Sequence, residues 1–214
     1  MENNIDLKDI VIVSCGTLNP EIKYLRENNM LEVQKVLFTA PGLHEDCNEL
    51  EKQLIERIEK AKEISNSGKV IVLYGGKFCY VNGNDPYRTM KTIIEERGPD
   101  VVRVDATHCM DMLASGAERD EIAGDKKVFW FTPGWVIYRH NVFKGWDKGL
   151  ANENFPRHDG GVVILDGIDF FDNYMNEKPE EILEYSDWMG VPISAHKINL
   201  DRFKSLLIQA RDNL

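Results

Sequence analysis

The sequence predicts an α/β protein, with one domain over residues 1–214 built on a mostly parallel open sheet that carries helices on both faces. Short β-branched apolar runs alternate with segments of helical periodicity along the whole chain, and this alternation is typical of βαβ units. The first run, Ile10–Ser14, is apolar at consecutive positions, as expected of a strand that is buried on both faces. No linker, fixed-period repeat or low-complexity tract divides the chain.

The predicted strands are short and end at small, polar or turn-forming residues. They span residues 10–14, 33–39, 69–74, 101–104, 127–132, 161–165 and 191–198. Proline at position 20 suits the first turn of a helix over 20–30. A helix over 46–65 follows from apolar residues at helical spacing, and Gly68 favours a left-handed cap after it.

The remaining helices are predicted from similar signals. A helix over 86–97 stops at Gly98-Pro99, and a second runs to Ser115-Gly116 after a cap at Asp105 or Thr107. The chain ends in a helix over 201–214. The polar stretch 141–159 is predicted as a loop or short helix, and the acidic run 177–184 as a solvated helix face.

Composition and charge exclude several classes of protein. A formal charge of −10 argues against binding to nucleic acid or to an anionic membrane surface, because both would repel the chain. No apolar run approaches the ~20 residues that span a bilayer. Four cysteines are too few for a disulfide scaffold, and the start of the chain lacks the pattern of a secretory signal. We therefore expect a cytoplasmic protein with reduced thiols.

Cysteine and histidine follow four successive predicted strands, at the point where each strand ends. Cys15 follows the first strand, His44 the second, Cys79 the third, and His108 with Cys109 the fourth. Because parallel strands end at the same edge of a sheet, where ligands bind, we expect these side chains to lie close together.

Thiolate and imidazole are the ligands that zinc prefers. We therefore predict a zinc site formed by Cys15, Cys79 and Cys109, with His44 or His108 as the fourth ligand. Three cysteines also suit a [4Fe–4S] cluster with one iron left open to substrate. The simpler interpretation of any single cysteine here is burial in the core, and no CxxC pair strengthens the metal prediction. The joint placement at one edge favours a site.

Other residues at the same edge are candidates for binding substrate. Tyr74 and Gly75 begin a glycine-rich loop that can present backbone N–H groups to an anion, although the loop lacks the spacing of a nucleotide P-loop. Thr132 and Trp135 follow the fifth predicted strand, where Trp135 can form a pocket wall. Cys47 lies inside a predicted helix and is expected to have no role.

These positions carry a resemblance to a known family. Cys15-Gly16, Leu43-His44, Tyr74-Gly75 with Cys79, and His108-Cys109 resemble, in this order, the motifs of the uncharacterised family numbered 1638 among domains of unknown function. The resemblance covers roughly residues 10–165, and the loop before Cys79 is longer than in the family pattern. Members occur in methanogens and anaerobic bacteria, near genes for corrinoid-dependent methyltransferases.

Several functions remain open at this point. The first is a zinc-binding protein, an enzyme or an accessory protein, acting in one-carbon or corrinoid-dependent methyl transfer. In it His44 and His108 are candidate catalytic groups, and the partner is a small-molecule substrate or a corrinoid protein. The second is an iron–sulfur protein for a redox or lyase step, and the third a non-enzymatic module that binds a metal or a corrinoid. In the fourth, the cysteines are structural.

Overall fold

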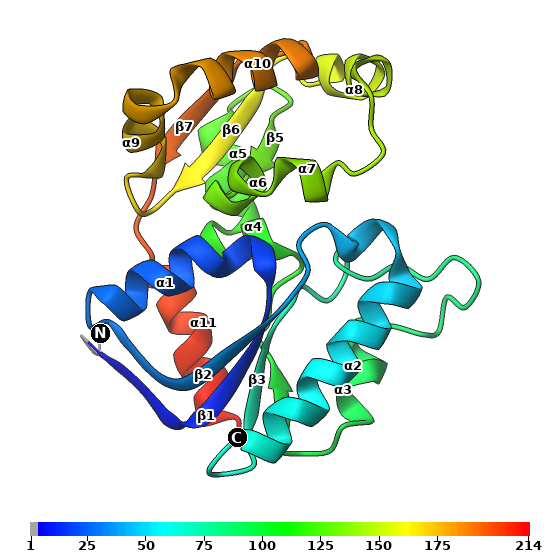
Figure 1. The fold of residues 1–214 in the computed structure, drawn as a ribbon, viewed down its shortest axis with the longest axis vertical. Helices are drawn as coiled ribbons and strands as arrows, with labels where there is room; N and C mark the ends of the chain where they lie inside the picture. The colour runs from blue at the N-terminus through cyan, green and yellow to red at the C-terminus, as the bar shows by residue number, and fades with distance from the viewer. Residues whose placement is uncertain (1–3) are drawn as a thin grey trace.

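The strands within residues 4–214, which the computed structural model describes, form two parallel sheets (Figure 1). The first sheet has the order β2-β1-β3-β4, with β1 over Ile5–Cys15, β2 over Leu31–Thr39, β3 over Val70–Leu73 and β4 over Val101–Arg103. The second has the order β5-β6-β7, with strands over Phe129–Phe131, Val162–Asp166 and Ile193–Lys197. Every strand pair is parallel, which confirms the α/β class and the parallel pairing. The strands were expected in one sheet, and the structure divides them between two.

The first sheet is covered by helices on both faces. Helices α1 (Asn19–Glu27) and α11 (Asp201–Asp212) pack on one face, and α2 (Cys47–Ile64) and α3 (Met90–Glu95) on the other (Figure 1). Alternate residues of β1 enter two different cores: Ile12 joins the cluster around α1 and α11, whereas Val11 and Val13 join the cluster around α2. Both faces of the strand are therefore buried, as the continuous apolar run predicts.

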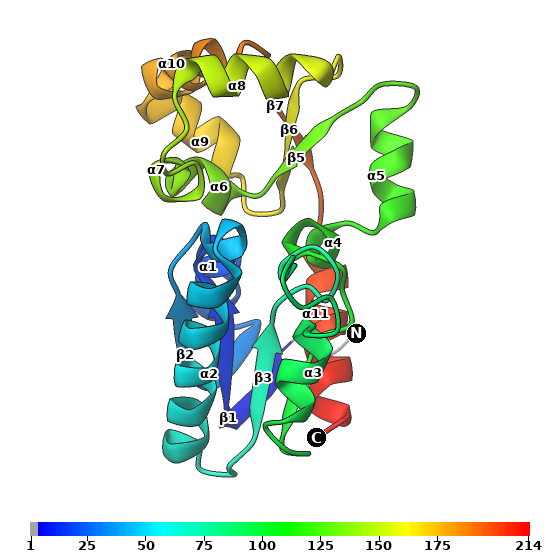
Figure 2. The same ribbon diagram turned by 90° about the vertical axis from the view of Figure 1, so that its right-hand side faces the viewer.

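The second sheet carries most of the remaining helices. Helices α6 (Pro133–Ile137), α7 (Arg139–Val142), α8 (Lys148–Asn154), α9 (Phe170–Glu177) and α10 (Pro179–Met189) lie to one side of it, and α5 (Gly116–Ala123) lies on the other side (Figure 2). The described residues also form helix α4 (Cys109–Leu113) and three 3-10 turns: η1 (Gly16–Leu18), η2 (Leu43–Glu45) and η3 (Phe155–Arg157). No helix in the described part of the chain is long and apolar enough to cross a membrane.

Some predicted boundaries differ from the observed ones. The predicted helix over 86–97 is shorter, because Arg88 closes a turn on the carbonyl of Asp85 and the helix begins only after Thr89, which caps it. The first strand starts earlier than expected, at Ile5, and its pairing with β2 shifts register between Leu7 and Val11. Within 141–159, α8 forms because the Asp147 carboxylate accepts a hydrogen bond from the backbone of Leu150.

The chain divides into two lobes that share one apolar core. The first lobe contains the β2-β1-β3-β4 sheet, residues 4–115 and 201–214, and the second contains the β5-β6-β7 sheet, residues 116–200. Helix α11 returns to the first lobe and packs on β1 and β3, so the chain crosses between the lobes twice. Buried residues of both lobes, including Ile12 and Phe131, belong to the same hydrophobic cluster.

Glycines allow the backbones of the two lobes to approach closely. A Cβ atom on Gly134 in α6 would lie 2.0 Å from the carbonyl oxygen of Thr17, and one on Gly42 would lie 2.4 Å from the carbonyl oxygen of Asn141. The hydroxyl of Thr132 donates a hydrogen bond to the same Thr17 carbonyl over 3.2 Å. Residues around Thr17 therefore fix the second lobe on the first.

A buried acid lies close to this contact. The side chain of Glu21 in α1 is fully buried, and among residues 4–214 neither of its carboxyl oxygens has a hydrogen-bond partner. Burial raises the pKa of Glu21 to about 8, and the charge of Asp166 raises it as well. At neutral pH the Glu21 carboxyl is therefore mostly protonated and neutral.

We predict that Gly134→Ala destabilises the protein by about 2–4 kcal/mol, because the new methyl group overlaps the backbone of Thr17 and the lobes must separate to admit it. Gly116→Ala is the matched control, since a Cβ atom there meets nothing within 4 Å. It should be neutral or stabilise by roughly 0.5–1 kcal/mol. Chemical denaturation measures both free energies of unfolding, and equal stabilities would contradict the close lobe contact.

A second prediction concerns the pH dependence of stability. The Glu21 pKa rises from 4.5 in the unfolded chain to about 8 in the folded one, so between these values the folded state keeps a proton that the unfolded state has lost. The Glu21 contribution to stability is therefore full below pH 4.5 and falls by about 1.4 kcal/mol per pH unit up to pH 8. Glu21→Gln should flatten this slope in denaturation curves measured across that window, and parallel curves for both proteins would refute it.

Candidate functional site

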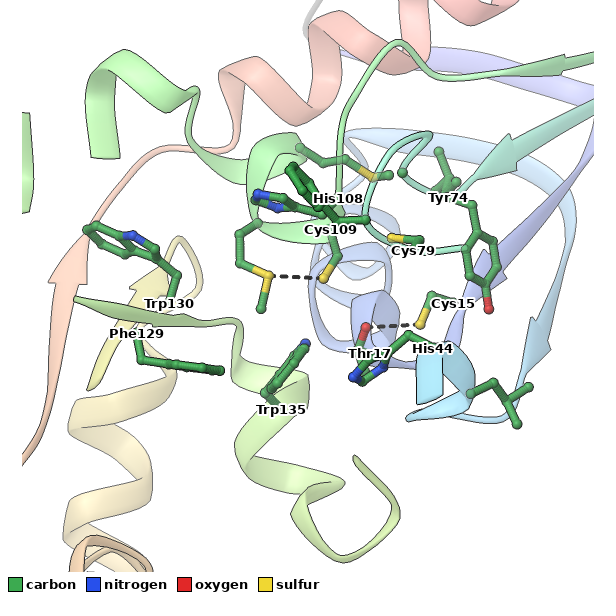
Figure 3. Close-up of a pocket in the computed structure, with 16 residues that line it drawn as sticks. Cys15, Thr17, His44, Tyr74, Cys79, His108, Cys109, Phe129, Trp130 and Trp135 are labelled. Atoms are coloured by element: carbon green, nitrogen blue, oxygen red, sulfur yellow. Dashed lines mark hydrogen bonds between the residues drawn. The ribbon is translucent and has the colours of Figure 1, made fainter. Parts of the chain in front are cut away.

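One pocket between the lobes collects all five cysteine and histidine side chains predicted at the strand ends (Figure 3). Its volume is about 230 Å³. The lining residues are Cys15, Thr17, Leu43, His44, Leu73, Tyr74, Gly75, Phe78, Cys79, His108, Cys109, Met110, Met112, Phe129, Trp130 and Trp135. Among the described residues, no Asp, Glu, Lys or Arg lines the pocket, so its walls are apolar, aromatic and rich in sulfur.

Cys15 is the last residue of β1 and points into the pocket. It pairs in register with Thr39 of the neighbouring strand β2. The chain then turns into η1, which brings the hydroxyl of Thr17 to 3.1 Å from the Cys15 sulfur. The carbonyl of Thr17 also accepts the hydrogen bond from Thr132 of the second lobe. Cys15 therefore lies directly beside the contact between the lobes.

Cys79 is held by a loop that packs against the segment before α4. Backbone N–H groups of Gly76 and Lys77 donate to the carbonyls of Ala106 and Thr107. A Cβ atom on Gly75 would lie 2.3 Å from the His108 Cα atom, so only glycine permits this approach. Behind the loop, the Arg103 guanidinium donates to the carbonyls of Tyr74, Val104 and Ala106. These contacts place Cys79 beside Cys109.

Cys109 is the first residue of α4, and the cap of that helix differs from the prediction. His108 is the cap, because its Nδ1 atom accepts a hydrogen bond from the Asp111 backbone. Thr107 instead donates from its backbone and its hydroxyl to the Asp111 carboxylate. Nδ1 of His108 is engaged in this cap, and its Nε2 lies 3.4 Å from the guanidinium of Arg119, so both ring nitrogens already have a neighbour.

Asp111 connects α4 to the rest of the first lobe. Its carboxylate accepts from Arg202 of α11 over 3.2 Å, and Arg119 lies at 4.0 Å. Burial opposes ionisation of Asp111, but the hydrogen bonds from Thr107 and the charges of Arg202 and Arg119 keep its pKa below the ordinary value. The ionised Asp111 therefore fixes the helix that carries Cys109.

His44 and Trp135 face the thiols from two different lobes. The two rings stack with centroids 5.5 Å apart and an interplanar angle of 27°. Burial lowers the pKa of His44, so its imidazole is neutral at physiological pH. Phe78 closes part of the rim over His108, with ring centroids 5.6 Å apart, and is itself 56% exposed.

The three thiols share one electrostatic environment. Burial raises the pKa of Cys15, Cys79 and Cys109, to about 12 for Cys79, and negative charge on one thiol raises the pKa of its neighbours. Without a bound cation these groups are therefore protonated thiols, unlike the low-pKa thiolates of nucleophilic enzymes. Within residues 4–214, however, no three Cys, His, Asp or Glu side chains converge closely enough to hold a single metal ion.

The structure leaves some predicted residues outside the pocket. Thr132 is buried and does not line the pocket, because its hydroxyl binds the carbonyl of Thr17. Cys47 begins α2 and also lies outside it. Sequence reasoning missed other lining residues, namely Thr17, Phe78, Met110 and Met112. The two methionines follow Cys109 within one short helix, so their proximity to it was the only available signal.

Comparison with known proteins adds a family to this geometry. The model of a family described as a protein of unknown function (DUF1638) matches residues 38–207, which is most of the chain. The chain belongs to the DUF1638 family. This confirms the resemblance noted from the sequence. No curated protein and no solved structure matches the chain.

The DUF1638 match contains four of the five reactive residues of the pocket. His44, Cys79, His108 and Cys109 lie inside the matched segment, and Cys15 precedes it. Helix α11 and the second lobe also fall largely within the match. The pocket between the lobes is therefore built mostly from the part of the chain that defines the family.

We predict that Asp111→Ala destabilises the protein by about 3 kcal/mol, because Thr107 and Arg202 lose their buried acceptor and Arg119 loses the negative charge beside it. Asp187→Ala is the control: Asp187 pairs with Lys148 on the surface, where such a pair contributes about 0–1 kcal/mol. Urea denaturation compares the two variants. Equal losses would show that Asp111 does not fix α4.

Proposed function

We propose that this protein binds a metal centre through the thiolates of Cys15, Cys79 and Cys109, and acts through it on a small uncharged molecule. One observation carries the proposal: three thiols from the segments that follow β1, β3 and β4 face one cavity that no carboxylate of residues 4–214 lines (Figure 3). Thiolates select zinc, copper(I) and iron–sulfur clusters over magnesium or calcium, which require oxygen ligands.

The spread of the thiols favours a cluster over a single ion. No three potential ligands within residues 4–214 converge on one point, and a zinc ion requires four ligands around one centre. In a [4Fe–4S] cluster each cysteine binds a different iron, so its ligands lie farther apart and three of them leave one iron free for substrate. Zinc bound by the three thiolates and His44 is the alternative, and it requires the thiols to move inward.

The buried thiols also suit a cation. Each thiol is neutral at neutral pH when the pocket holds no cation, because burial opposes its ionisation, and for Cys79 and Cys109 the neighbouring thiols oppose it as well. A metal centre supplies positive charge and deprotonates the ligands outright. Arg103 is the nearby positive charge that lowers the Cys79 pKa, and its hydrogen bonds hold it behind the loop, outside the pocket.

The pocket walls support a small uncharged molecule as the substrate. The cavity has a volume of about 230 Å³ and no charged lining residue within 4–214, so it admits a small molecule and gives no counter-charge to a phosphate or carboxylate. His44, neutral and stacked on Trp135, is positioned to take or return a proton. Tyr74 is engaged with Thr39 through its hydroxyl and forms the wall beside Cys15.

For the zinc alternative, the proposed reaction is methyl transfer. A metal that deprotonates a substrate thiol makes it a better methyl acceptor. A corrinoid is far larger than this cavity, so a corrinoid partner would present its methyl group at the rim. The iron–sulfur form corresponds to a redox or lyase step on the open iron. A pocket that binds metal but no substrate would be a storage or delivery module.

We predict that the anaerobically purified protein takes up iron and sulfide, with visible absorption, when both are supplied. Cys15→Ser, Cys79→Ser and Cys109→Ser should each lower the metal content at least severalfold, because serine is a poor ligand for a soft metal. Circular dichroism should change little, since the domain is large enough to fold on its own core.

Cys47→Ser is the matched control and should retain the wild-type metal content, because Cys47 lies outside the pocket. Stoichiometric zinc in place of iron would support the alternative centre. If neither metal binds, or if Cys47→Ser loses as much metal as the other three variants, the proposed centre is wrong.

A further inference from the structure

Trp135 brings an unpartnered hydrogen-bond donor into the pocket from the second lobe. Its side chain is nearly buried, at 9% exposure, and it lines the cavity. Among residues 4–214 its Nε1–H group has no hydrogen-bond partner, although a buried tryptophan N–H usually finds one. An orphaned donor at this place indicates an acceptor that forms only when the site is in use.

The donor faces the Cys109 thiol. Figure 3 shows the indole nitrogen of Trp135 on the side of the ring that is turned toward the Cys109 sulfur. In the neutral thiol the sulfur is a weak acceptor, and it lies 3.1 Å from the sulfur of Met110, to which it donates.

The orientation of the Trp135 ring is fixed by its neighbours. It stacks on His44, and the ring centroids of Phe131 and Phe143 lie 5.2 Å and 5.7 Å from its own. The adjacent Gly134 rests on the backbone of Thr17. The indole cannot turn its N–H toward solvent without disturbing the contact between the lobes.

We propose that the Nε1–H of Trp135 donates a hydrogen bond to the Cys109 thiolate when that sulfur binds the metal centre. The inference rests on the proposed function and deepens it by adding a positioning residue from the second lobe. When the metal–sulfur bond forms, the thiol proton leaves to solvent and no electrons are transferred. The sulfur then becomes a charged acceptor, and a hydrogen bond to a charged group is stronger than one to a neutral group.

This hydrogen bond would connect the state of the metal centre to the arrangement of the lobes. The three thiolates belong to the first lobe, and Trp135 belongs to α6 of the second. Binding of metal in the first lobe therefore gains a contact that only the correctly placed second lobe supplies. Metal binding should therefore stabilise the contact between the lobes at Thr17 and Gly134.

The indole N–H signals of the four tryptophans test this directly in the ¹⁵N-labelled full chain, with cadmium(II) as a diamagnetic, thiolate-seeking probe. The Trp135 signal, assigned by its loss in Trp135→Phe, should move downfield on cadmium binding and exchange more slowly with solvent. Trp146 is the internal control, because its Nε1–H already donates to Glu45 over 3.1 Å. Its signal should stay in place.

Affinity gives the second measurement. Trp135→Phe keeps an aromatic ring and removes the donor, so its dissociation constant for cadmium should rise about tenfold or more. If the wild type binds cadmium through the three cysteines but the Trp135 signal and the variant's affinity do not change, the donor role is refuted and the metal centre stands. If the cysteines bind neither cadmium nor iron with sulfide, the metal centre falls and the donor role falls with it. If only iron and sulfide bind, the Trp135 signal is measured in the cluster-loaded protein, and an unchanged signal refutes the donor role. Should Trp135→Phe fail to fold, the wild-type signals decide alone, assigned by Trp130→Phe, Trp146→Phe and Trp188→Phe.

Discussion

The pocket depends on one backbone contact between the lobes. Gly134 of α6 lies on the carbonyl of Thr17, which also accepts the hydrogen bond of Thr132. Thr17 in turn lies 3.1 Å from the Cys15 sulfur, so the contact that joins the lobes and the first thiol of the site belong to the same short turn. A larger residue at position 134 cannot occupy this place without moving the wall that carries Trp135. The geometry of the site and the docking of the lobes therefore have a common cause.

The main electrostatic property of the pocket is the lack of charged side chains among the described residues that line it. The walls contain no carboxylate, ammonium or guanidinium group among the described residues, so burial keeps the three thiols protonated at neutral pH in the absence of a cation. The charges that do occur near the site are held outside it: Arg103 by the carbonyls behind the Cys79 loop, and Asp111 by Arg202 and Arg119. These groups fix the backbone that presents the thiols and leave the cavity itself uncharged. Such a cavity disfavours the entry of a charged molecule, because none of these groups would supply a counter-charge.

The buried Glu21 of α1 is an unpartnered polar group among residues 4–214, and the charge of Asp166 in the second lobe acts on it. Its carboxyl is protonated at neutral pH because burial opposes ionisation and Asp166 adds negative charge. Like the N–H of Trp135, it lowers stability in the structure as it stands. The two groups differ in their access to the pocket. The indole of Trp135 lines the cavity, whereas Glu21 does not. Only the indole is therefore available to a ligand of the pocket.

The sequence by itself determined the α/β class, most strands of both sheets and the set of cysteines and histidines at the strand ends. It did so because β-branched runs, helical periodicity and the rule that parallel strands end at one edge are local or pairwise properties. Those properties also brought Cys15, His44, Cys79, His108 and Cys109 to one pocket. Tertiary structure decided that the strands form two sheets, because pairing between distant strands leaves no local pattern. It also decided that His108 caps α4, that Thr132 serves the lobe contact, and that Trp135 faces Cys109 from the other lobe. These roles depend on which backbones approach one another in space. The spacing of residues along the chain does not predict such approaches.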